Sequence, residues 1–358
     1  MAILRGPYLA LAAALSVLLG CARDTALAPA PTDTDPTPVE LQLPVGVLAA
    51  VGGPLLPSDN PLTEQGIALG RSLFYEKALS DDLTLSCGSC HLQANAFADP
   101  RAFSEGTDGS IGTRNAMSLV NLAWSAKLFW DGRVEGLEAQ AHDPVTNPVE
   151  MRNTWPVVED RLNADATYRQ RFREAFGTEQ IDSTLVTKAL AQFVRSLVSF
   201  DSPFDRYWYG GDSTAMSEEA QNGLALFTSQ GKCAGCHAPG LFTDHALRNN
   251  GLDVVLSDAG FGAVTGDPAD MGKFKVPTLR NIAVTAPYMH DARFATLEQV
   301  LNHYNGGVHM ASPNVDLLMD FWGMNPTPFS ADEINDLSAF LNALTDASFL
   351  TDPALAQP

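Results

Sequence analysis

Apolar residues recur at helical spacing in the middle of the chain. The stripe consists of Val186, Leu190, Phe193 and Leu197, and residues three or four positions apart share one face of an α-helix. The pattern predicts an amphipathic helix over 183–199, which ends before the Ser-Pro pair at 202–203. The Gly-Gly-Asp turn at 210–212 is the predicted boundary between two domains.

A second helix signal lies near the C-terminus. Ser330 and Glu333 have the spacing of a capping box, and the apolar residues that follow share one face: Ile334, Leu337, Phe340, Leu341 and Leu344. Two further helices are predicted over 63–75 and 217–228. Because strand signals are sparse, the sequence predicts a mainly α-helical protein with long loops.

The N-terminal part of the chain is patterned differently. Arg5 precedes a short apolar run over 8–19, which is typical of a secretory signal peptide and too short to predict a membrane span. The run ends in Leu-Leu-Gly-Cys21, which resembles the bacterial lipobox, in which the cysteine is lipidated. Cleavage nearby without lipidation is the alternative. Residues 24–40 are rich in Pro, Thr, Ala and Asp, which is typical of a flexible tether.

We therefore expect a signal peptide over 1–20 and a lipidated N-terminus with its tether over 21–45. This places the protein in the periplasm, anchored to a bacterial membrane through Cys21.

The charge of the chain limits its partners. With 42 acidic and 22 basic residues among 358, the formal net charge is −20. A nucleic-acid partner is therefore not expected, whereas a basic redox partner would be attracted. Acidity that only keeps an exported protein soluble is an equally good explanation.

Two short motifs carry most of the chemical information. They read Cys87-Gly-Ser-Cys90-His91 and Cys233-Ala-Gly-Cys236-His237. In this pattern, typical of c-type haem attachment, the two thiols form thioethers with the haem and the histidine binds its iron. A zinc site and a thioredoxin-like redox pair are the alternatives, but zinc requires four ligands and each motif offers three.

The motifs also divide the chain. Each is preceded by a predicted helix that contains a Gly-x-x-x-Phe sequence, at 70–74 and 223–227, so that a weak internal repeat is visible. The sequence thus predicts two cytochrome-c-like haem domains, over 46–210 and 211–350. Since the two motifs use four of the five cysteines, no pair remains for a disulfide.

Over about residues 45–348 the chain resembles the bacterial dihaem cytochrome c peroxidase family, which includes MauG-like enzymes. The resemblance rests on the two motifs and on the segments 129–133 (Phe-Trp-Asp-Gly-Arg), 202–207, 275–281 and 285–291. It implies that the haem bound by His91 meets peroxide and that the haem bound by His237 handles electrons. Trp130 would relay electrons between them, although a tryptophan can equally be a core residue.

The resemblance also implies a peroxide pocket beside the first haem. Glu150 would act as acid and base, because a partly buried carboxylate can move a proton between the peroxide oxygens. Gln140 would donate a hydrogen bond to bound peroxide, and Pro144 occupies a further pocket position. A solvated Glu150 at a helix start is the alternative, and His142 is left open as a pocket residue.

Two departures from typical family members are informative. Typical members close the resting first haem with a histidine that follows the first motif, whereas residues 100–114 contain no histidine and Thr107 stands near that place. The iron at His91 is therefore expected to rest open, with Met117 as an alternative ligand or core residue.

The second departure concerns the other haem. Where typical members have a methionine ligand, this chain has Tyr304, as MauG-like members do. An anionic oxygen ligand lowers the reduction potential and favours high-valent iron. Met289, Met310 and His303 are the rival ligands.

The resemblance further implies a Ca²⁺ between the domains, at Asn115, Thr285 and Pro287, because oxygen donors suit this ion.

Together these features predict a dihaem c-type peroxidase that reduces H2O2 through high-valent iron shared by two haems. Its electron donor would be a small cytochrome c or a cupredoxin. The alternatives are a MauG-like maturation enzyme that oxidises Trp or Tyr of a partner protein, and a dihaem electron carrier without catalysis. A homodimer is left open.

Overall fold

The computed structural model describes residues 35–229, 232–320 and 328–358. The predicted signal peptide, Cys21 and most of the predicted tether lie outside these ranges. Within them, no helix combines the length and the apolar character that a membrane span needs.

Helices dominate the described residues, as the sequence predicts. The α-helices are α1 (Val47–Val51), α2 (Glu64–Phe74), α3 (Leu137–Thr146), α4 (Trp155–Ala164), α5 (Ala166–Phe176), α6 (Ser183–Ser196), α7 (Pro203–Trp208), α8 (Glu218–Thr228), α9 (Gly262–Thr265), α10 (Leu297–Asn302), α12 (Ala331–Asn342) and α13 (Ala347–Thr351). The short strands form two antiparallel pairs, β1 (Lys127–Leu128) with β2 (Val134–Glu135) and β3 (Leu247–Arg248) with β4 (Phe274–Lys275).

Side-chain caps explain where three of the predicted helices begin. The Thr63 hydroxyl accepts from the amide of Gly66 at the start of α2, and Ser217 caps α8 in the same way. At α12 both halves of the capping box form: the Glu333 amide donates to Ser330 Oγ, and the Ser330 amide donates to the Glu333 carboxylate at 2.8 Å. All three predicted helices are confirmed.

Helix α6 ends at Ser196, earlier than the predicted Ser199. The Asn121 side chain competes for the backbone beyond this point. Its Oδ1 accepts from the Ser199 amide at 2.9 Å and its Nδ2 donates to the Ser199 carbonyl at 3.1 Å. The chain therefore leaves the helix to satisfy these bonds.

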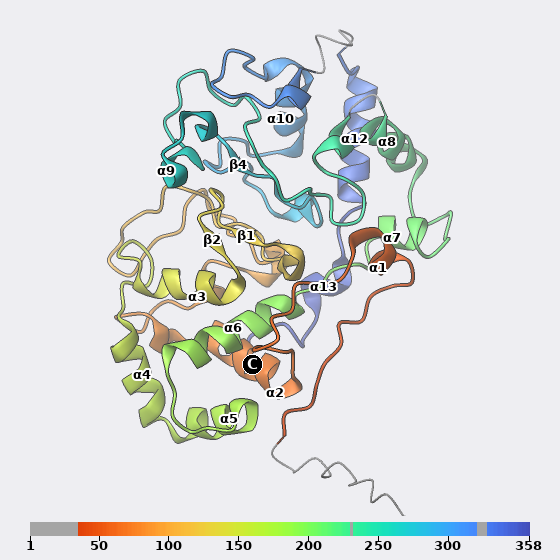
Figure 1. The fold of residues 1–358 in the computed structure, drawn as a ribbon. Coiled ribbons are helices and arrows are strands. Elements are labelled where there is room, and N and C mark those ends of the chain that lie inside the picture. Colours follow the sequence, from red (N-terminus) through yellow and green to blue (C-terminus); the bar gives the residue numbers. More distant parts are fainter. Residues whose placement is uncertain (1–34, 230–231, 321–327) are drawn as a thin grey trace, which may run out of the picture. The chain divides into compact units, whose positions relative to one another are not determined.

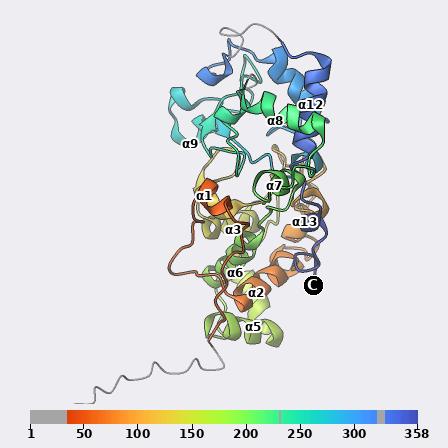
Figure 2. The same cartoon turned by 90° about the vertical axis from the view of Figure 1, so that its right-hand side faces the viewer.

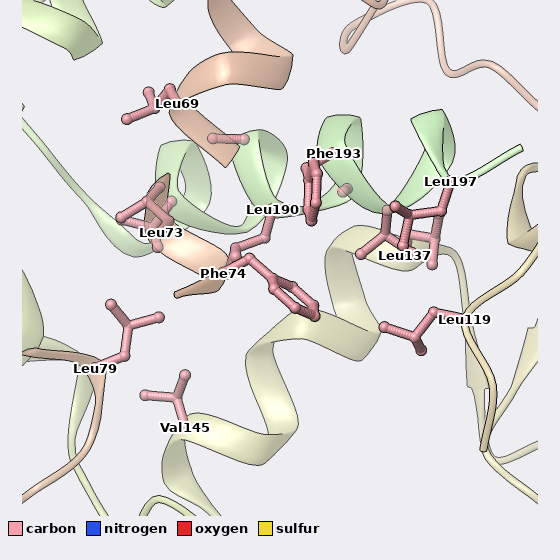
Figure 3. Close-up of a cluster of buried hydrophobic side chains, with 14 of the residues drawn as sticks. Leu69, Leu73, Phe74, Leu79, Leu119, Leu137, Val145, Leu190, Phe193 and Leu197 are labelled. Carbon is pink, nitrogen blue, oxygen red and sulfur yellow. The ribbon is translucent and has the colours of Figure 1, made fainter. Parts of the chain in front are cut away.

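The N-terminal core forms where α2 packs against α6, and the two helices lie side by side in both views (Figures 1 and 2). A Cβ on Gly70 would lie 1.9 Å from the carbonyl oxygen of Ala189, so only glycine permits this close approach. Phe74 and Phe193 fill the space beside the crossing, within the cluster of buried side chains in Figure 3.

The C-terminal core repeats this arrangement with α8 and α12. A Cβ on Gly223 would lie 2.0 Å from the carbonyl oxygen of Asp336, and Phe227 and Phe340 fill the adjoining space. The weak repeat seen in the sequence is thus a repeat in three dimensions. We call the parts built around these two cores the first and second modules.

A buried ion pair joins two of the segments that carried the family resemblance. Arg280, in 275–281, donates to both carboxylate oxygens of Asp205, in 202–207, at 2.8 and 2.9 Å, and both side chains are almost fully buried. Such a bidentate pair fixes the geometry of both segments.

Residues 35–358 form one compact unit, and its last segment returns to the first module. Phe349 of α13 packs against Phe97 at 5.7 Å between ring centroids. The division at 210–211 stays a prediction.

Candidate functional site

The first Cys-x-x-Cys-His motif forms a tight turn that presents its histidine. Residues Cys87–Ser89 make a single 3-10 turn, and the His91 amide donates to the Cys87 carbonyl at 2.9 Å. The His91 ring bonds through Nδ1 to the carbonyl of Phe97 at 2.7 Å. This bond leaves Nε2 as the nitrogen for a metal, and burial lowers the pKa of His91, which favours the neutral ligand form.

The second motif repeats this geometry. Cys233–Gly235 form the same 3-10 turn, the His237 amide donates to the Cys233 carbonyl at 2.8 Å, and the ring Nδ1 bonds to the Phe242 carbonyl at 2.9 Å. Burial again lowers the pKa of His237. The sequence therefore builds the same histidine orientation twice.

Each module contains a set of three packed phenylalanine rings. In the first module Phe74 lies 5.2 Å from Phe193 and 5.8 Å from Phe97, measured between centroids. In the second, Phe227 lies 5.1 Å from Phe340 and 6.1 Å from Phe242. Because Phe97 and Phe242 also supply the carbonyls that orient the histidines, the packing of the rings fixes the orientation of the ligands.

A cavity of about 240 Å³ opens beside the second motif. Cys233, Cys236, His237 and Tyr304 line it, together with Trp130 of the first module. A mostly apolar cavity with two thiols and a histidine at its wall fits a covalently attached haem. Cys87, Cys90 and His91 offer the same three groups for the other haem.

The zinc alternative is not supported. Throughout the described ranges, no three His, Cys, Asp or Glu side chains group closely enough to hold a metal ion. Burial raises the pKa of the Cys87 and Cys233 thiols to about 12.

Trp130 lies where the two modules meet. Its indole Nε1 donates to the Asn115 carbonyl at 2.9 Å, and its carbonyl accepts from the amide of Lys275 in the second module at 2.7 Å. Its ring stands 6.4 Å from that of His290. This position between the modules is the one that an electron relay requires.

Glu150 lies in the turn that follows α3. Asn147 Nδ2 donates to its Oε1 at 2.6 Å, and burial raises the pKa of the carboxyl group. Its charge in turn contributes to the raised pKa of Cys87, which shows that it lies near the first motif. A fully solvated Glu150 is therefore not supported.

The other predicted pocket residues lie on α3. Gln140 and Pro144 are one helical turn apart and so share a face. His142, by contrast, is exposed and packs on the Trp155 ring at 5.0 Å. The structure gives no support to His142 as a pocket residue.

The loop that contains Thr107 packs against the turn that contains Glu150. The Thr107 amide donates to the Glu150 carbonyl at 3.0 Å, and a Cβ on Gly106 would lie 2.6 Å from the Val149 carbonyl oxygen. The Thr107 hydroxyl is buried and finds no hydrogen-bond partner among the described residues. It can donate a hydrogen bond but cannot replace a histidine as an iron ligand. Its burial could not be predicted from the sequence.

The backbone of Met117 lies near the His91 ring, because it contributes to the pKa of His91 against the effect of burial. Met117 also lines the cavity beside the second motif. Its alternative role as a ligand stays a prediction.

Tyr304 lines the cavity of the second motif. It belongs to a π-helical turn, His303–Gly307, that continues α10. Asn250 Nδ2 donates to its hydroxyl at 3.2 Å, and burial raises the pKa of Tyr304 to about 12.

The rival ligands differ in position. Met289 also lines the cavity and contacts Asn250 Nδ2 through its sulfur at 3.6 Å. Met310 is 47 % exposed. The His303 ring bonds to the Asn250 carbonyl at 3.2 Å. Tyr304 and Met289 therefore remain the two candidates that face the cavity.

The two modules contain a pair of corresponding segments that was not recognised from the sequence. Segments 129–133 and 289–293 share an Asp-x-Arg sequence, and each begins at a residue in the left-handed region, Phe129 (φ 62°) and Met289 (φ 72°). Each leads into a helix, α3 or α10. Pro144 follows Trp130 by the same number of residues by which Tyr304 follows His290. Proline, which has no donor atom, thus takes in the first module the place of tyrosine in the second.

The three residues predicted to bind calcium line one cavity: Asn115, Thr285 and Pro287. The Asn115 Nδ2 donates to the Asp99 and Arg101 carbonyls at 3.2 and 2.9 Å. Calcium binding stays a prediction.

Comparison with known proteins identifies the class to which this arrangement belongs. The family model for di-haem cytochrome c peroxidase matches residues 64–214. The methylamine utilization protein MauG of Methylorubrum extorquens is 39 % identical, with 84 % of each chain covered. The cytochrome-c peroxidase IdrP1 of Denitromonas iodatirespirans is 35 % identical, over 85 % of this chain and 87 % of that one.

A solved structure agrees with these relatives. It is a MauG-like protein associated with microbial copper homeostasis, with a TM-score of 0.80 and 36 % identity over 86 % of this chain and 97 % of that one. The chain belongs to the di-haem cytochrome c peroxidase and MauG family.

Proposed function

We propose that this chain is a dihaem peroxidase that reduces H2O2 with electrons from a protein donor. The observation that carries the proposal is the contrast between the open sides of the two modules. For the first we expect Pro144, the buried Thr107 hydroxyl and the Glu150 carboxylate, none of which is a strong iron ligand in the way of histidine or methionine. The second presents Tyr304.

The chain's own residues prepare both sites. His91 and His237 would bind iron through Nε2, because a backbone carbonyl holds each Nδ1. Each haem supplies, when bound, an iron that exchanges electrons and that can bind peroxide where its outer side is free.

Glu150 would move the proton that O–O cleavage requires. Its raised pKa keeps a carboxylate basic enough to take a proton from one peroxide oxygen and acidic enough to return it to the other. Gln140 would hold the peroxide by a hydrogen bond. Trp130 would carry electrons between the modules, because it bonds to the backbone of both.

Mixing the resting, fully oxidised protein with H2O2 in a stopped-flow spectrometer tests this proposal. A rapid change in the Soret band without prior reduction is expected, because the proposal leaves the first iron open. Reaction only after one electron has been added would mean that a hidden ligand closes it. No reaction in either state would favour a two-haem electron carrier.

A second candidate function is maturation of a partner protein by oxidation of its Trp or Tyr. Tyr304 at the second cavity favours it, and so does the similarity to proteins named MauG and MauG-like. Offering reduced small cytochrome c and reduced cupredoxin to the peroxide-treated protein distinguishes the two candidates. Rapid turnover supports detoxification, and failure with both donors supports a specific protein substrate.

We also propose that Cys21 anchors the protein to a membrane facing the periplasm, because a lipobox-like sequence ends the N-terminal apolar run. Fractionation of cells that express Cys21→Ala tests this. Release of the variant into the soluble periplasm is expected, and an unchanged membrane fraction would contradict it.

A further inference from the structure

His245 is a partly buried residue whose two ring nitrogens find no hydrogen-bond partner in the described part of the chain. Its backbone is held in the left-handed region (φ 57°), and its amide donates to Thr243 Oγ1 at 2.9 Å. Both ring nitrogens are buried, and neither finds a partner among the described residues. The ring lines the same cavity as Cys233 and His237. A buried imidazole usually satisfies at least one nitrogen, so a group that the protein chain does not supply is expected here.

Lys275 is a second unusual group in this wall. The side chain is only 5 % exposed, and its ammonium donates to Ser125 Oγ at 2.9 Å. In the described part of the chain no carboxylate lies within ion-pair distance of this ammonium, which differs from the other buried cations. Arg248, which lines the same cavity, pairs with Asp244 and Asp316.

The two groups lie on paired segments: the Val276 amide donates to the Ala246 carbonyl at 2.9 Å, and Lys275 pairs with Leu247 where β3 meets β4. Burial lowers the pKa of His245 to about 4, and the charge of Lys275 contributes to this shift. Burial alone lowers the pKa of Lys275 to about 8. Burying an ammonium without an anion is unfavourable, so His245 and Lys275 together are better explained as the two sides of a site for a carboxylate.

We propose that His245 and Lys275 form a carboxylate-binding site for a propionate side chain of the haem attached at Cys233 and Cys236. A ring N–H of His245 and the Lys275 ammonium donate to the propionate oxygens. The Lys275 amide donates to the Trp130 carbonyl, so the site also joins the second haem to the segment that carries the relay tryptophan. The proposal rests on haem attachment at this motif and not on peroxidase activity.

The test uses the full-length holoprotein and the variants Lys275→Gln and His245→Leu. Removing the positive charge of Lys275 disfavours the reduced iron, so the reduction potential of the His237 haem is expected to fall. The expected size is at least a tenfold change in its reduction equilibrium, or 59 mV for one electron. The potential of the His91 haem should change much less. Lys273→Gln is the matched control, because Lys273 is two residues away and pairs with Asp270.

A second readout observes the carboxylate itself. In protein grown with haem labelled by ¹³C at the propionates, the redox-difference infrared band of the labelled carboxylate should shift in both variants and stay unchanged in Lys273→Gln. Lys275→Arg, which keeps the charge, should retain the potential and the band. If Lys275→Gln does not fold, His245→Leu and Lys275→Arg decide the question.

An unchanged band and potential in Lys275→Gln and His245→Leu would overturn the proposal. Peptide mass analysis reports the other failure separately: a peptide that contains Cys233 and Cys236 without attached haem in the wild-type protein would mean that the second motif carries none. A lost peroxide reaction with two haems and a shifted band would leave the carboxylate site standing.

Discussion

The two modules share a scaffold and differ at the face that a haem iron would expose. Both cross their helices at a glycine, pack three phenylalanine rings and hold a histidine by its Nδ1. Pro144 in the first module and Tyr304 in the second stand at equivalent positions, each the same number of residues after the start of α3 or α10. The comparison teaches that one scaffold is built twice, while a single equivalent position differs, and under the proposed function this position decides whether the iron stays open.

Under the proposed function, proton transfer distinguishes the first module, and Glu150→Gln should therefore have the largest effect. General acid and base groups contribute about 10²- to 10⁴-fold in rate, and we expect the reaction with H2O2 to slow by this factor. Stopped-flow absorbance of the oxidised holoprotein measures it. Glu135→Gln is the control, because this carboxylate is exposed. A rate within a factor of three of the wild type would remove Glu150 from the mechanism.

Because the two modules share a scaffold, one equivalent substitution in each should lower the stability by the same amount. Gly70→Ala and Gly223→Ala each place a methyl group about 2 Å from a backbone carbonyl oxygen of the facing helix. We expect each to lower the free energy of unfolding by about 2–3 kcal/mol, measured by denaturant unfolding of the holoprotein.

Gly53→Ala is the control for both, because nothing lies within 4 Å of its added Cβ. Its stability should match the wild type. A loss in only one of the two modules would show that the helix crossings are not equivalent.

Tyr304 distinguishes the second module, and Tyr304→Phe removes its oxygen while keeping the ring. Loss of an anionic ligand favours the reduced iron, so the potential of the His237 haem should rise. A tenfold change in the reduction equilibrium corresponds to 59 mV, and spectroelectrochemistry resolves it. Tyr288→Phe is the control, because Tyr288 lines the same cavity but donates to the Ile282 carbonyl. An unchanged potential would point to Met289 as the ligand.

Local signals made much of this architecture predictable. The capping residues Thr63, Ser217 and Ser330 and the apolar stripe of α6 act within a few positions of the helices they specify. The haem motifs are equally local, so their turns and histidines could be predicted. The end of α6 could not be predicted, because the Asn121 side chain that hydrogen-bonds to Ser199 beyond the helix is distant in sequence.

The missed features all depend on long-range burial. The ring nitrogens of His245, which find no partner among the described residues, and the buried hydroxyl of Thr107 follow from how loops pack. The exclusion of His142 has the same origin, because its packing on Trp155 depends on where α4 lies against α3. Trp130 and His290 are each followed by an Asp-x-Arg sequence. The two segments could be recognised as equivalent only from the structure, in which each leads into a corresponding helix, α3 or α10.

The pH dependence of the peroxide reaction is the most subtle difference between the modules, since it depends on one carboxyl group. Burial raises the pKa of Glu150 above its ordinary value of 4.5, while the amide of Asn147 opposes the shift by stabilising the carboxylate. Because the base must be ionised, the rate should be constant at high pH and fall as the pH drops through this raised pKa, by at most tenfold per unit. Asn147→Ala removes the donor, so its midpoint should move to higher pH. Glu150→Gln should lose this dependence, and a midpoint that stays in place in Glu150→Gln would assign the titration to another group.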